Sequence, residues 1–115
     1  MKHLLISGIR SYDDRDTLYR LADEIIGEEM DSVIIVGTCA GVNTLALDYA
    51  LEHGMELVEF LPEQSDAMIF FAKKKEGISL AIWDEEEKET SQLIDGCRKA
   101  GIDTRVWSTK SGGFL

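Results

Sequence analysis

Five short apolar runs recur along the chain, separated by gaps that are long enough for a helix in each. The runs are largely apolar at consecutive positions, whereas a strand with one face in water is apolar at every second residue. Such runs are typical of strands buried on both faces of a sheet. The predicted strands are residues 4–9, 33–36, 57–61, 79–83 and 104–107.

Helical spacing is found in the gaps between these runs. The apolar residues from position 18 to position 26 recur at intervals of three and four, which predicts one buried stripe on a helix. That helix is expected to begin near Asp14 or Asp16. Similar stripes cover residues 42–50, followed by Gly54, and residues 93–100, ended by Gly101.

Strands that alternate with helices of this length indicate an α/β fold. We expect three layers, with a parallel sheet of about five strands and helices on both of its faces. The chain has 115 residues, one proline and no low-complexity stretch, so we expect a single domain over residues 1–115, with a loose tail at 108–115. The ligand of such a sheet lies beyond the carboxyl ends of the strands, where we expect loops 7–14, 37–43 and 83–90.

The second of these loops carries the clearest chemical signal. Gly37 and Gly41 bracket a turn that follows an apolar run and precedes a helical pattern. A turn of this kind leaves backbone N–H groups unpaired at the positive end of a helix, where an anionic group of a ligand accepts them. The pattern favours a phosphate-binding loop; the alternative is a tight turn that only joins a strand to a helix.

Charge and cysteine content exclude several classes of partner. The chain has 22 acidic and 12 basic side chains and a formal net charge of -10, so its field repels nucleic-acid backbones and anionic membrane surfaces. Cys39 and Cys97 form no metal-binding or disulfide pattern, and the first apolar run is too short for a signal peptide. We expect a cytoplasmic protein that has no metal or cofactor and binds neither nucleic acid nor membrane.

Three sequence elements carry a family resemblance. They are the Gly-Ile-Arg turn at residues 8–10, the Gly-x-x-x-Gly-x-Asn turn at residues 37–43, and an apolar strand that ends at Asp84 and is followed by Thr90. Together they resemble the SLOG superfamily, the Rossmann-like group that joins the DNA-processing Smf proteins to the Lonely-guy phosphoribohydrolases, and its YspA-type members in particular. The resemblance implies a Rossmann-like fold and a nucleotide or nucleotide-derived ligand that contains ribose phosphate.

Two positions and one signature depart from the family pattern. Asn43 stands where the family has aspartate, and keeps a capping side chain without its charge. Glu89 stands where the family has the glycine before Thr90, which hinders a close approach of backbone to phosphate. The Pro-Gly-Gly-x-Gly-Thr signature of the Lonely-guy enzymes is absent.

The loops and the resemblance predict a set of ligand-binding residues. Arg10 is expected to hold an anion with two hydrogen bonds, the alternative being an ion pair with Asp13 or Asp14. The polar side chains of the second loop are equally suited to cap the helix that follows. The predicted ligand-binding residues are Gly8, Arg10, Gly37, Thr38, Gly41, Asn43, Thr44, Asp84 and Thr90.

Other chemistry-bearing residues have a structural interpretation that we favour. The acids at positions 13, 14 and 16 are suited to the first turn of a helix, where its dipole stabilises them, rather than to a metal site. Trp83 ends an apolar strand and is expected to pack in the core instead of stacking on a base. Cys39 has no histidine near it in sequence to activate the thiol as a nucleophile.

Residues 67–72 are apolar around a whole helical circumference, which exceeds the single stripe that a core-facing helix needs. We expect a homodimer through this helix; deep packing against the sheet is the alternative.

Three functions from different classes remain. The first is the binding of a nucleotide or nucleotide-derived ligand through the loop at residues 37–43. The second is hydrolysis of the N-glycosidic bond of a nucleoside monophosphate, with Glu89 or Asp84 assisting. The third is a dimeric interaction module without a ligand.

Overall fold

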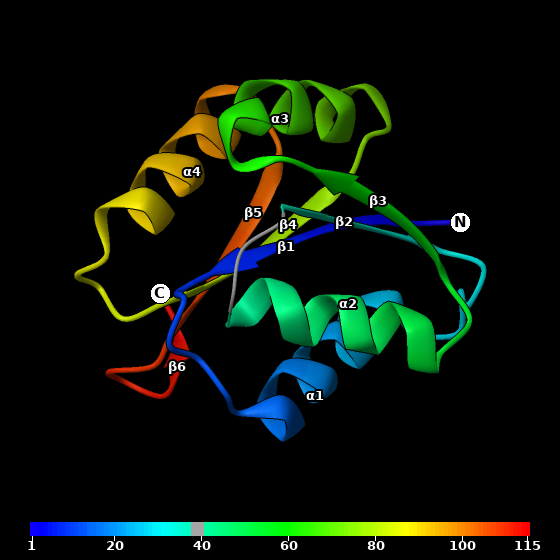
Figure 1. Cartoon of the computed structure of the whole chain (residues 1–115), viewed down its shortest axis with the longest axis horizontal. Coiled ribbons are helices and arrows are strands. Elements are labelled where there is room, and N and C mark those ends of the chain that lie inside the picture. The colour runs from blue at the N-terminus through cyan, green and yellow to red at the C-terminus, as the bar shows by residue number, and fades with distance from the viewer. Residues whose placement is uncertain (38–40) are drawn as a thin grey trace.

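The computed structural model describes residues 1–37 and 41–115 and has a three-layer α/β architecture (Figure 1). Within these residues, six strands form one sheet in the order β3-β2-β1-β4-β5-β6. Five strands are parallel, and β6 is antiparallel to β5. The strands are β1 (His3–Gly8), β2 (Val33–Gly37), β3 (Glu56–Phe60), β4 (Ile78–Trp83), β5 (Asp103–Ser108) and β6 (Gly113–Phe114).

Four α-helices in the described part of the chain cover both faces of the sheet. Figure 1 shows α1 and α2 on one face and α3 and α4 on the other, which confirms the predicted fold class. A 3-10 turn, η1 (Pro62–Gln64), leads into α3. The helices are α1 (Arg15–Ile26), α2 (Val42–Glu52), α3 (Ser65–Lys74) and α4 (Lys88–Lys99). None of these helices has the length and apolar composition that a membrane span requires.

Successive residues of the central strand β1 pack on opposite faces of the sheet. Leu4 and Ile6 belong to the core under α1 and α2, whereas Leu5 belongs to the core under α3 and α4. All three side chains are fully buried. Because both faces are covered by helices, the strand is apolar at consecutive positions, as the sequence predicts.

Helix boundaries follow the predicted caps. The Asp14 carboxylate caps α1, accepting hydrogen bonds from the backbone N–H of Thr17 at 3.1 Å and from its Oγ1 at 2.6 Å. These bonds lower the pKa of Asp14. Gly54 and Gly101 lie just beyond the ends of α2 and α4, with φ angles of 63° and 81° that favour glycine.

The C-terminal residues differ from the loose tail that the sequence suggests. Gly113–Phe114 pair with Trp107 and Ser108 of β5, and the Phe114 ring meets the Trp107 ring edge to face at 5.3 Å between centroids. A strand of two residues is too short to show an alternation of apolar and polar positions in the sequence. Its pairing with β5 depends on the folded arrangement of the chain.

Helix α3 carries the apolar excess noted in the sequence. It buries Met68 and Ala72 against the sheet, while Phe70 on its outer side is 71% exposed. Part of the excess is therefore core, and part is surface. The homodimer through this helix stays a prediction.

Two leucine substitutions test the buried sheet. Leu5→Ala removes a fully buried side chain from the central strand and is expected to lower the free energy of unfolding by about 2–5 kcal/mol, because it leaves a cavity between the sheet and two helices. The matched control is Leu51→Ala on α2, where the side chain is 66% exposed. We expect that change to stay within about 0.5 kcal/mol. Urea denaturation of both variants measures the difference, and equal losses would contradict the assignment of β1 to the core.

Candidate functional site

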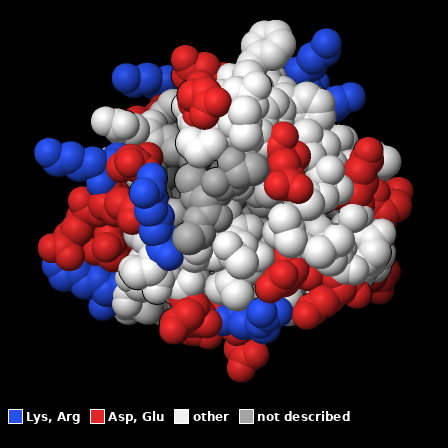
Figure 2. Space-filling model, in the orientation of Figure 1, with Lys and Arg blue, Asp and Glu red and all other residues white. Residues whose placement is uncertain are grey.

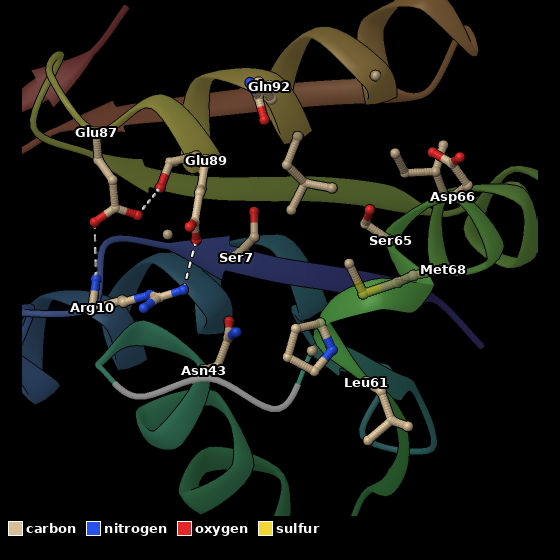
Figure 3. A pocket seen from close by; sticks show the side chains of 17 residues that line it. Ser7, Arg10, Asn43, Leu61, Ser65, Asp66, Met68, Glu87, Glu89 and Gln92 are labelled. Carbon is tan, nitrogen blue, oxygen red and sulfur yellow. Dashed lines mark hydrogen bonds and ion pairs between the residues drawn. The ribbon is translucent and has the colours of Figure 1, made fainter.

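An open cavity of about 440 Å³ lies at the edge of the sheet where the parallel strands end (Figure 3). We call it the edge pocket. The ends of β1 and β2, the η1 turn, the start of α2 and the facing sides of α3 and α4 contribute its walls. Its lining among the described residues is Ser7, Gly8, Arg10, Gly37, Asn43, Leu61, Pro62, Ser65, Asp66, Met68, Ile69, Glu87, Glu89, Thr90, Gln92, Leu93 and Gly96.

The structure brings most of the predicted site residues to this pocket. Those that line it are Gly8, Arg10, Gly37, Asn43 and Thr90. Gly41, Thr44 and Asp84 do not line it, and Thr38 lies outside the described residues, as does Cys39. The three predicted loops therefore meet at one edge of the sheet, as expected for a doubly wound α/β fold.

Two glycines permit the backbone to pack closely beside the pocket. A Cβ on Gly8 would lie 2.5 Å from the carbonyl oxygen of Ile82 and 2.7 Å from Val42 Cγ2. Gly41 has a φ of 70°, and a Cβ there would overlap the backbone of Ile9 and Arg10. Both glycines are required by the packing of the chain, so the loss of binding on substituting either would not identify a ligand contact.

Arg10 joins the first loop to the start of α4. Its guanidinium Nη2 lies 2.8 Å from Glu89 Oε2, and its backbone N–H donates to Glu87 Oε2 at 3.3 Å (Figure 3). The sequence also allows an ion pair of Arg10 with Asp13 or Asp14. That partner is wrong, because the fold brings Glu89, which is distant in sequence, to the Arg10 guanidinium. Arg10 is thus already paired with a carboxylate.

Glu87 is fixed by several interactions at the N-cap of α4. Its Oε1 accepts a hydrogen bond from Thr90 Oγ1 at 2.8 Å, while its Oε2 faces the Arg10 backbone. Trp83 Nε1 donates to the Glu87 carbonyl at 3.0 Å, and the Trp83 ring packs against the core as predicted. Thr90 is buried and holds this carboxylate in place.

Asp84 organises the loop before α4. Its Oδ1 accepts hydrogen bonds from the backbone N–H groups of Glu86 at 2.9 Å and Glu87 at 2.8 Å. These bonds lower the pKa of Asp84, since they stabilise the ionised carboxylate. Its structural role is that of a turn-capping residue, and it does not line the edge pocket.

Asn43 and Ser7 present polar groups to the pocket, and one of these groups has no hydrogen-bond partner among the described residues. Asn43 Oδ1 is buried and accepts no hydrogen bond. Ser7 is 4% exposed and also lines the pocket. In Figure 3 the Ser7 and Asn43 side chains point into the pocket from β1 and α2. Buried polar groups are normally satisfied, so Asn43 Oδ1 is a candidate for ligand contact.

The lining also includes residues that the sequence analysis did not single out. Helix α3 contributes Met68 and Ile69, and α4 contributes Gln92 and Leu93, so one wall of the pocket is largely apolar. In the sequence, the apolar excess over residues 67–72 is the signal for this wall, and on its own it indicates an interface.

Acidic side chains dominate the charged part of the lining. Asp66, Glu87 and Glu89 line the pocket together with one cation, Arg10, among the described residues. Residues 38–40 are uncharged in the sequence. Figure 2 shows acidic side chains spread around the rim of this face of the molecule. Over residues 1–37 and 41–115, no group of three His, Cys, Asp or Glu side chains is arranged to hold a metal ion.

The N-terminal part of the chain matches a known protein family. Residues 3–66, more than half of the chain, match the family model YAcAr, described as the YspA, cpYpsA-related SLOG family. The matched region includes the turns at residues 8–10 and 37–43 and ends before β4 and α4. No match was found among curated proteins or among solved structures.

Asp84→Ala tests the loop that positions α4. The ionised Asp84 carboxylate caps two backbone N–H groups, so we expect the variant to lose about 1 kcal/mol of unfolding free energy at pH 7. Because the pKa of Asp84 is lowered in the folded protein, this contribution exists above the unfolded pKa and is lost as the pH falls through the folded pKa.

Urea denaturation at several pH values from 7 down to 2.5 measures this effect. The difference between wild type and Asp84→Ala is expected to shrink at the acidic end. Glu86→Ala, which removes an exposed neighbouring carboxylate, is the control and is expected to change stability little at any pH. A difference for Asp84→Ala that is the same at pH 7 and pH 2.5 would show that the carboxylate charge is not involved.

Proposed function

Because the chain belongs to the YspA, cpYpsA-related SLOG family, we propose that it binds a nucleotide or nucleotide-derived ligand in the edge pocket. The single observation that supports this most is Asn43 Oδ1, a buried acceptor without a partner among the described residues, which faces the cavity together with the Ser7 side chain. A bound ligand that donates a hydrogen bond would satisfy this acceptor. The volume of about 440 Å³ falls in the range of small-molecule sites.

The two sides of the pocket suit the two chemical parts of such a ligand. Met68, Ile69 and Leu93 form an apolar wall between α3 and α4, which is suited to a nucleobase. Opposite this wall lie Arg10 and Asn43, with the N-terminal turn of α2 beside them. Hydrogen-bond donors and the positive end of a helix dipole favour a sugar or a phosphate there.

A thermal-shift screen against nucleosides and nucleotides tests the proposal. A ligand at ten times its dissociation constant stabilises the folded protein by about 1.4 kcal/mol, which corresponds to a rise in melting temperature of about 5 °C for a domain of this size. We expect at least one nucleotide-derived compound to produce such a rise in the wild type.

A pair of tryptophan substitutions on α4 locates the site. Gln92→Trp places a bulky ring at an exposed position in the pocket lining and is expected to abolish the thermal shift. Asp95→Trp, at an exposed position on the same helix outside the lining, is the matched control and is expected to retain it. A shift that survives Gln92→Trp would place the ligand elsewhere. No shift with any compound would favour the interaction module.

Hydrolysis of an N-glycosidic bond is a second candidate, which the position of Glu89 favours. Its carboxylate points into the pocket beside Arg10, where a general acid or base would act on a bound nucleoside monophosphate (Figure 3). Release of free base, measured by chromatography after incubation with each monophosphate that binds, would identify this activity. Turnover is expected to fall at least about tenfold in Glu89→Gln if the carboxylate takes part in catalysis.

A further inference from the structure

The charges and hydrogen-bonding groups of the edge pocket define its ligand more narrowly than the family does. We propose, on the basis of the proposed function, that the pocket selects a nucleoside-type ligand with at most one phosphate, and that Glu89 is the residue that excludes nucleoside di- and triphosphates. The apolar wall accepts the base in this arrangement, and the polar groups opposite accept the sugar.

The unpartnered acceptor of the pocket calls for a hydrogen-bond donor on the ligand. Asn43 Oδ1 is a carbonyl oxygen, which can only accept a hydrogen bond. A sugar hydroxyl donates to such an oxygen, whereas a fully ionised phosphate has only acceptors. The Ser7 hydroxyl donates or accepts and so matches a second hydroxyl of the same sugar. The two groups therefore fit a sugar with free hydroxyls better than a phosphate chain.

The cation that a phosphate would seek is already engaged. Arg10 Nη2 lies 2.8 Å from Glu89 Oε2, so a phosphate that approaches Arg10 must either displace this carboxylate or lie beside it. Displacing the Glu89 carboxylate breaks its ion pair with Arg10. Leaving it in place brings the negative charges of Glu89 and the phosphate close together. One phosphate group can share Arg10 with Glu89, but each further phosphate adds negative charge without another cation in the described lining.

Glu89, rather than its neighbour Glu87, is the acid able to discriminate. The Glu87 carboxylate is held by Thr90 Oγ1 at 2.8 Å and by the Arg10 backbone N–H, so it contributes a fixed charge. The Glu89 side chain is 68% exposed and its carboxylate pairs with Arg10 at the pocket, so a ligand meets it directly. An exposed ion pair of this kind is weak enough to open.

Isothermal titration calorimetry at low ionic strength tests the proposal. The probes are the nucleoside, mono-, di- and triphosphate of each common base, titrated into the wild type, Glu89→Gln and Glu86→Gln. In the wild type we expect the best monophosphate to bind about tenfold or more tightly than its triphosphate, since like charges repel across the pocket. Glu89→Gln is expected to reduce this ratio by about fivefold by strengthening triphosphate binding.

Glu86→Gln removes the same charge from an exposed neighbour outside the lining and is expected to leave the ratio within about twofold of the wild type, because solvent screens it. A triphosphate that binds the wild type as well as its monophosphate overturns the proposal, as does an unchanged ratio in Glu89→Gln. The proposed function survives both of these results. If no nucleoside or nucleotide binds the wild type or Glu89→Gln, the proposed function fails as well.

Discussion

The backbone of Ile9 joins three elements that position the site. Its N–H donates to the carbonyl of Ile82 in β4 at 3.1 Å, and its carbonyl accepts from the N–H of Val42 at the start of α2 at 3.2 Å. These two bonds are compatible only with glycine at positions 8 and 41, since a side chain at either would collide with the neighbouring backbone. The geometry of the pocket therefore depends on backbone contacts before any polar side chain is considered.

Arg10 follows Ile9 directly, and its position is a consequence of the same contacts. With the preceding residue fixed on both sides, the Arg10 backbone N–H reaches Glu87 and its guanidinium reaches Glu89. Asp84 fixes the other side of this contact by capping the turn from which α4 begins. The polar edge of the pocket is thus built from two turns, the one at Arg10 and the one before α4, which are joined by hydrogen bonds. The acidic side chains at this edge outnumber the basic one.

The sequence predicts the fold well because the inner strands β1, β2 and β4 are buried on both faces and the helices α1 and α4 are amphipathic, and both leave a readable pattern. It also places the loops of Gly8, Asn43 and Thr90 at one edge, because parallel strands share a direction. Other features depend on tertiary packing. The Arg10–Glu89 pair joins residues far apart in the chain, and α3 closes the pocket with apolar residues that carry no chemical motif. The sequence places Asp84 at the edge of the sheet where a ligand is expected, but its carboxylate accepts hydrogen bonds from the backbone of its own loop.

The separation of Arg10 and Glu89 along the chain has a consequence for folding. Strand β1 lies between β2 and β4, so the first turn of the site exists only when strands from both halves of the chain have paired with it. The pocket then needs α4 to dock as well, which closes a loop of most of the sequence and is slow relative to local helix formation. Formation of the Arg10–Glu89 contact during refolding would therefore report the completion of the native structure, whereas recovery of helical circular dichroism would report an earlier stage.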